Sequence, residues 1–196
     1  RELLQLFEQR TYIGYTATPF ANIFIDDSSE NEEHGEDLFP SDFIHSLDAP
    51  SNYVGARHYF EEPRTNLIYI EDMENALPIK HKNGSTMEYI PKSLRQAVLA
   101  FIIVRAVRLS RAQAKSHNSM LVNVSRFTSV QNDVADNLFG LLEEFRRDIR
   151  LYGGLPPREA AQSSTISEIK DIFEATYADV AETWEEILPN LIEAVS

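Results

Sequence analysis

The feature that most constrains the fold is a stripe of apolar residues at helical spacing in the second half of the chain. The stripe consists of Val130, Val134, Leu138, Leu141, Phe145 and Ile149. Thr128 and Gln131 are placed to form a capping box at its start, and Gly153-Gly154 would end the helix. The preceding run, 119–125, is rich in β-branched and apolar residues, which predicts a strand. A strand followed directly by an amphipathic helix indicates an α/β fold.

Other strand patterns lie nearer the N-terminus. Nearly uncharged runs of β-branched and aromatic residues predict strands at 11–17 and 66–70. Asn83-Gly84 predicts a tight turn between 78–82 and 85–90, because both positions tolerate positive φ. We therefore expect a small antiparallel hairpin there.

Further helix patterns flank and follow the main stripe. Residues 2–9 are typical of the last turns of a helix, and a mostly buried helix is predicted from Pro91 to about residue 114. Pro156-Pro157 predicts a linker. Thr165 and Glu168 predict a second capping box, for a helix to about residue 177, and a last helix around 180–191 is expected to kink at Pro189.

Composition excludes several classes of protein. The 196 residues include no cysteine, which excludes disulfide scaffolds, zinc ribbons and thiol nucleophiles. The longest apolar run, 97–104, is far shorter than the roughly 20 residues that cross a bilayer. We therefore expect a cytoplasmic protein with no membrane partner. The opening RELLQLFEQR is typical of the middle of a helix, so we also expect the chain to be a fragment of a larger protein.

Charge is distributed unevenly along the chain. The net charge is −13, yet residues 89–132 hold seven Lys or Arg and no Asp or Glu. Arg105, Arg108 and Arg111 fall mostly along one side of the predicted helix and are candidates for tracking a nucleic-acid backbone. The alternative is a solvated helix face whose cations pair with carboxylates elsewhere, and the sequence leaves both open.

Candidates for catalytic chemistry are weak. Glu71, Asp72 and Glu74 follow a predicted strand and are weak candidates for metal ligands, because a solvated turn explains them better. Glu168-Ile-Lys170 has the E-x-K spacing of one nuclease fold, but it lies on a predicted helix and no Pro-Asp precedes it suitably. The histidines show no helical metal-ligand spacing, so no metal site is predicted. None of the seven glycines belongs to a phosphate-binding loop.

Two segments resemble a known family. Thr16-Ala17-Thr18-Pro19 resembles motif III of superfamily-two helicases, which links ATP hydrolysis to movement between two RecA-like lobes. The longer strings YIGYTATPFANIFI, from Tyr12, and MLVNVSRFTSVQN, from Met120, are together similar to the Z-one domain family. Members of that family are bacterial proteins labelled as endonucleases and associated with helicase-type ATPase segments and with restriction or DNA-defence systems.

The resemblance implies an architecture. It implies an α/β fold with a partial RecA-like parallel sheet, flanking helices, the small antiparallel hairpin as an insertion and a helical C-terminal part. The implied segments are the end of a first lobe at 1–25, an acidic and β-rich insertion at 26–90, the start of a second lobe at 91–154 and C-terminal helices at 155–196.

The resemblance also implies functional roles. Thr16 and Thr18 would couple the lobes, and Ser125, Arg126 and Thr128 would hold a phosphate where a strand end meets a helix N-terminus. The alternative is that Ser125 and Thr128 only cap the helix. ATP and Mg²⁺ would serve the full-length parent, with no cofactor in this fragment, and the partners would be DNA and other subunits of the system. Two alternatives stay open: a metal-dependent endonuclease that uses Glu71, Asp72 and Glu74, and a non-catalytic protein-interaction module.

Overall fold

The structure is a computed structural model that describes residues 6–9, 11, 13–18, 30–31, 35–36, 44–61 and 67–196. The chain divides into two units, residues 1–64 and 65–196, and each is described by itself. The four segments implied by the family resemblance stay a prediction about the parent protein.

The described part of the first unit contains three short elements. These are β1 (Glu30–Asn31), β2 (Gly35–Glu36) and α3 (Ala56–Phe60). β1 pairs antiparallel with β2, and Glu30 lies opposite Glu36. This small hairpin lies in the acidic segment of the chain, in the part of the sequence where no strand was predicted.

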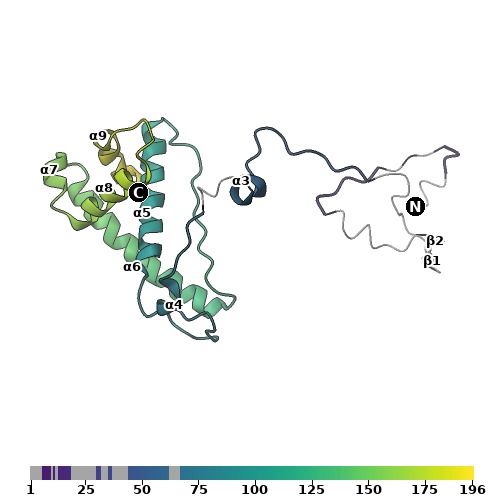
Figure 1. The fold of residues 1–196 in the computed structure, drawn as a ribbon, viewed down its shortest axis with the longest axis horizontal. Helices are drawn as coiled ribbons and strands as arrows, with labels where there is room; N and C mark the ends of the chain where they lie inside the picture. Colours follow the sequence, from purple (N-terminus) through teal and green to yellow (C-terminus); the bar gives the residue numbers. More distant parts are fainter. Residues whose placement is uncertain are drawn as a thin grey trace. The chain divides into compact units, whose positions relative to one another are not determined.

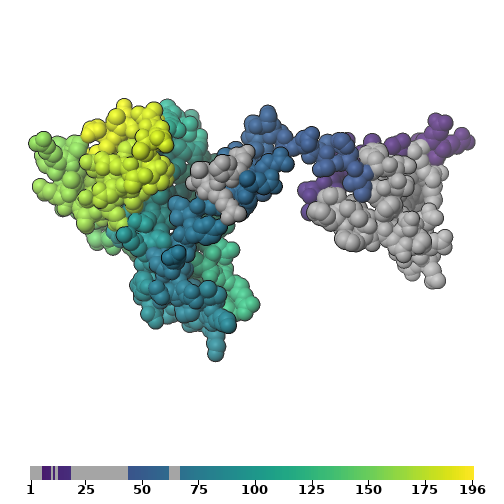
Figure 2. All heavy atoms as spheres, viewed as in Figure 1, coloured from purple at the N-terminus to yellow at the C-terminus, as the bar shows by residue number. Residues whose placement is uncertain are grey.

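The second unit is helical. Its elements are α4 (Met73–Ala76), α5 (Lys92–Ser110), α6 (Thr128–Tyr152), α7 (Pro157–Ala160), α8 (Ser164–Thr176), α9 (Trp184–Ile187), the 3₁₀ turn η1 (Leu188–Asn190) and α10 (Leu191–Ala194). Figure 1 shows α5 and α6 as the two long helices, with the C-terminal elements gathered beside them. The atoms of these C-terminal elements form one closely packed body with α5 in Figure 2. Among the residues that the structure describes, none of the helices combines the length and the apolar content needed to cross a bilayer.

The main core forms around α5. Leu99, Ile103 and Ala106 of this helix are fully buried. They belong to one cluster with side chains of α6, α8 and the C-terminal elements, which include Phe145, Ile149, Ile166, Ile169, Trp184, Ile187 and Leu191. A smaller second cluster joins α4 to the starts of α5 and α6 and consists of Ala76, Met87, Leu94 and Val134.

Arg95 links three helices at the edge of the main core. Its guanidinium on α5 donates to Glu168 of α8 (2.9 Å) and to Glu144 of α6 (3.2 Å). The same group lies over the Phe145 ring, 4.6 Å from its centre. Partial burial lowers the pKa of Arg95, but the bonds from Glu168 and Glu144 raise it by more. The E-x-K carboxylate, Glu168, therefore serves an ion pair within the protein.

The predicted α/β fold is wrong. In the described residues the only ladder is β1 with β2, and no parallel sheet forms. The described residues of the three strand-like segments, 11–17, 66–70 and 119–125, belong to no strand. Ile68 and Leu121 are 84% and 90% exposed. β-branched composition favours an extended backbone, but a strand also needs a neighbour to bond to, and these segments have none in the described structure.

The predicted hairpin is half right. The turn at Asn83-Gly84 forms: Ser85 N donates to Lys82 O (3.1 Å), and Gly84 has φ +83°. The flanking residues 78–82 and 85–90 form no strands, and two backbone donors of this region bond to side chains of α6. Gly84 N donates to Ser129 Oγ (3.0 Å) and Met87 N to Asp133 Oδ2 (2.7 Å).

The long helices are confirmed, while their caps differ from expectation. α6 ends before Gly153 as predicted, and the last helix is broken at Pro189 into α9, η1 and α10. Neither predicted capping box forms; Ser163 caps α8, and the box is at Thr183, whose N donates to Glu186 Oε2 (2.7 Å). Pro157 starts the short helix α7 in place of a linker.

The helix predicted at residues 2–9 is not seen in its described part. Residues 6–9 are turn and bend, and residues 1–5 lie outside the described residues.

Phe145 and Phe139 on α6 provide a matched test of the core. Phe145 is fully buried and Phe139 is 63% exposed. We expect Phe145→Ala to lower the free energy of unfolding by about 3–5 kcal/mol, because it leaves a cavity beneath Arg95. Phe139→Ala should change it by less than about 0.5 kcal/mol. Urea unfolding followed by circular dichroism measures both; equal losses would contradict this placement of the core.

Candidate nucleic-acid interface

The start of α6 is shaped by Ser125. Its hydroxyl accepts a hydrogen bond from Phe127 N (3.0 Å), and its carbonyl accepts one from the Gln131 side chain (2.6 Å). Ser125 is only 9% exposed. The serine therefore turns the chain into the helix, and Gln131 bonds to Ser125 where the predicted capping box would have paired it with Thr128.

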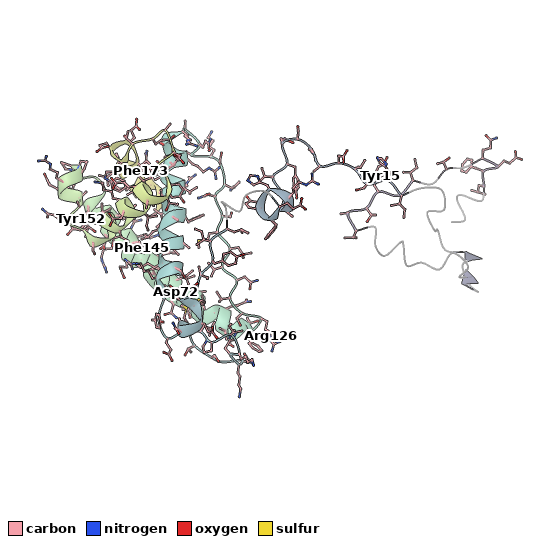
Figure 3. The ribbon with its side chains drawn as sticks, in the orientation of Figure 1. Tyr15, Asp72, Arg126, Phe145, Tyr152 and Phe173 are labelled. Atoms are coloured by element: carbon pink, nitrogen blue, oxygen red, sulfur yellow. The ribbon has the colours of Figure 1, made fainter. Side chains whose placement is uncertain are left out.

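The start of α6 carries positive charge. Arg126 and Thr128 are exposed, and the first turn of α6 holds no acidic residue. The amides of a first helical turn have no partner within the helix and carry the positive end of its dipole. Arg126 lies over the Phe127 ring, 4.9 Å from its centre, and Figure 3 shows it where α6 begins. The three residues that we predicted to contact a phosphate therefore lie together at this helix start, although the Ser125 hydroxyl already bonds to Phe127 N and to His81.

A turn far away in sequence packs against the same helix start through His81. The imidazole contacts Pro78 O through Nδ1 (2.8 Å) and Ser125 Oγ through Nε2 (2.7 Å). Because a carbonyl only accepts, Nδ1 donates to Pro78 O, and Nε2 shares the second hydrogen bond with the Ser125 hydroxyl. The edge of the ring also meets Phe127, with 5.9 Å between ring centres.

Ser129 makes a second connection between this turn and α6. Its hydroxyl accepts from Gly84 N (3.0 Å) and donates to Asn83 Oδ1 (2.5 Å). Sequence reasoning missed His81 and Ser129, since their partners lie 44–46 residues away. The Asn-Gly signal located the turn but not the surface on which it packs.

The arginines of α5 have partners within the protein. Arg105 donates to Ala114 O (2.9 Å) and Ser116 O (3.2 Å), and Arg108 donates to His117 O (2.7 Å). They therefore hold the loop that follows α5. Their predicted contact with a nucleic-acid backbone stays a prediction, and it would compete with these bonds.

Arg111 pairs with a carboxylate, as the alternative interpretation of this helix face expected. Its guanidinium donates two bonds to Glu182, at 2.6 and 2.9 Å. These bonds raise the pKa of Arg111 and lower the pKa of Glu182. The charge of Arg111 is thus largely neutralised within the protein.

The three acidic residues at 71–74 have different surroundings. Asp72 accepts from Ser93 N (2.8 Å) and from Ser93 Oγ (2.5 Å), which satisfies donors at the start of α5. These bonds lower the pKa of Asp72. Glu71 and Glu74 are exposed. In residues 67–196 and the other described stretches, no three His, Asp or Glu side chains lie close enough to hold a metal ion.

The Thr16 to Thr18 segment lies in the first unit. Thr18 N donates to Thr16 Oγ1 (3.1 Å), and both residues are exposed. Pro19 and the following residues up to 29 lie outside the described residues. The coupling role of Thr16 and Thr18 stays a prediction.

Comparison with family models identifies the domain. Residues 93–196, more than half of the chain, match the model of the Z1 domain. The chain belongs to the Z1 domain family. This confirms the Z-one resemblance, and the match begins at the second residue of α5 and includes Arg126 and Thr128 but not Thr16 or Asp72. Comparisons of this Z1 domain chain with curated proteins and with solved structures give no match.

Asp72 should stabilise the Z1 domain in a pH-dependent way. Because its folded pKa is lowered, its contribution is present above about pH 4 and is lost as the pH falls through the folded value. We expect Asp72→Asn to lower the thermal midpoint at neutral pH, with a difference from wild type that shrinks on acidification. Glu74→Gln, at an exposed neighbour, is the control. Calorimetry across pH measures the effect; a pH-independent difference would contradict it.

Arg108 should rigidify the loop after α5. We expect Arg108→Gln to speed amide hydrogen exchange in residues 113–118, because its bonds to His117 O and Asn118 Oδ1 are lost. Lys115→Gln removes an exposed cation from the same loop and should leave exchange unchanged. Exchange measured by mass spectrometry distinguishes them, and identical profiles would assign no anchoring role to Arg108.

Proposed function

We propose that this Z1 domain binds the phosphate backbone of DNA at the start of α6 and serves a larger DNA-acting restriction or defence protein. The observation that carries the proposal is Arg126, exposed beside first-turn amides with no acidic residue in that turn. A cation next to free N–H donors suits a phosphate, whose oxygens are negative and only accept hydrogen bonds.

The proposed role is binding and not catalysis. Asp72, the central residue of the endonuclease alternative, already accepts two hydrogen bonds from Ser93. In the parent protein, strand cutting or helicase-like ATP hydrolysis with Mg²⁺ would then use residues outside the α6 start. Thr128 and Arg126 would set where the backbone lies, without reading sequence.

A protein-interaction role is the second candidate. Exposed apolar side chains in two extended segments favour it, among them Ile68, Ile70 and Leu121. Exposed apolar side chains that lie together are typical of surfaces that meet another protein. A tight complex with a partner subunit and no affinity for DNA would favour this function over the first.

Arg126 and Arg150 provide the test of DNA binding. Both are exposed arginines, but Arg150 lies in the last turn of α6, about 33 Å along the helix from its first residue. We expect Arg126→Gln to weaken binding to duplex DNA of any sequence and to reduce the salt slope of log affinity by about 0.9, the value for one phosphate contact. Arg150→Gln should behave as wild type.

Fluorescence anisotropy at several salt concentrations measures this prediction. Thermal unfolding of each variant checks that the fold is retained. If Arg126→Gln leaves both affinity and salt slope unchanged, the α6 start is not the binding site.

A further inference from the structure

The turn from Pro78 to Ser85 carries two cations that have no role so far. Lys80 and Lys82 lie on either side of His81 and are exposed. The turn contains no Asp or Glu. None of the ion pairs among the described residues involves either lysine. Their charges are therefore free to meet an external anion.

The turn is held rigidly at both its ends and its middle. Ala76, before it, and Met87, after it, are buried in the small cluster with Leu94 and Val134. Between them, His81 bonds to Ser125 (2.7 Å) and Gly84 N to Ser129 (3.0 Å). The backbone that carries the lysines is thus fixed before any ligand arrives, which reduces the entropy lost on binding.

The same bonds place the lysines beside the proposed phosphate site. Arg126 directly follows Ser125, and Ser125 is the hydrogen-bond partner of His81. The His81 to Ser125 bond therefore joins two basic stretches that lie more than forty residues apart in the sequence. Lys80, Lys82 and Arg126 extend the positive surface beyond the helix start.

The aromatic ring in this region indicates which form of DNA fits. Proteins that prefer single strands stack bases on exposed aromatic rings. Here the Arg126 guanidinium carbon lies 4.9 Å from the centre of the Phe127 ring, and the His81 ring meets the same ring in a T-shaped arrangement with 5.9 Å between ring centres. These contacts cover the Phe127 ring, which favours contacts to a duplex backbone over base stacking on this ring.

We propose that the turn Pro78–Ser85 is a second arm of the DNA site, in which Lys80 and Lys82 contact duplex phosphates next to the one held at the α6 start. The inference rests on the proposed function. His81 is a positioning residue in this arm: it touches no phosphate and holds the turn on Ser125. The arm adds affinity for any duplex sequence and none for unstacked bases.

The double variant Lys80→Gln/Lys82→Gln tests the arm, with Lys92→Gln, at the exposed start of α5, as the control. We expect the double variant to reduce the salt slope for duplex binding by about 1.8, two phosphate contacts, equally on two unrelated sequences. Lys92→Gln should match wild type. If Arg126→Gln weakens binding while the double variant does not, the arm is overturned and the proposed function stands. If wild-type protein binds no DNA, the proposed function itself fails.

His81 has its own readout. We expect His81→Ala to lower duplex affinity by about threefold to tenfold, because the lysines must then be ordered on binding. The salt slope should stay at the wild-type value, since both lysines remain. His81→Gln keeps an acceptor for the Ser125 hydroxyl and should restore most of the affinity. Unchanged affinity in His81→Ala, with the fold retained by thermal unfolding, would overturn the positioning role.

Discussion

Burial of α5 is the constraint on which the second unit depends. Leu99, Ile103 and Ala106 are fully enclosed by α6, α8 and the C-terminal elements. The arginines of this helix therefore lie at the border of its buried face. Charges at the edge of a core are stable there when they find partners. Arg95 finds two carboxylates, and Arg105 finds loop carbonyls. These arginines of the basic segment therefore bond within the protein and hold neighbouring elements to α5.

The helices were predictable from the sequence, whereas the strands were not. Helical periodicity is a local property, so the stripe from Val130 to Ile149 defined α6 almost to its last residue. A strand depends on a neighbour that the sequence does not name. Residues 119–125 have the right composition, yet Leu121 is 90% exposed and the described structure gives the segment no ladder. Local propensity alone therefore gave a wrong prediction of a strand here.

The residues of the candidate site likewise differ in how far the sequence could locate them. The position of Arg126 and Thr128 at a helix start could be predicted, because a helix start and a neighbouring cation are visible in one short stretch; their contact with a phosphate stays a prediction. His81 with Ser125, and Asp72 with Ser93, could not be predicted, because each pair spans 44 or 21 residues. Asp72 shows that composition alone is a poor guide. Its cluster with Glu71 and Glu74 made a metal ligand conceivable, whereas its carboxylate accepts hydrogen bonds from Ser93 at the start of α5.

The bonds that attach the turn to α6 lie outside the main core. Gly84, Asn83 and Ser129 are exposed, so water replaces the lost partner when one of these bonds is removed. The core around Ile103 and Phe145 does not use them, because the turn has its own small cluster. Loss of the His81 bond leaves the bonds of Gly84, Asn83 and Met87 to α6 in place and removes no side chain of the main core.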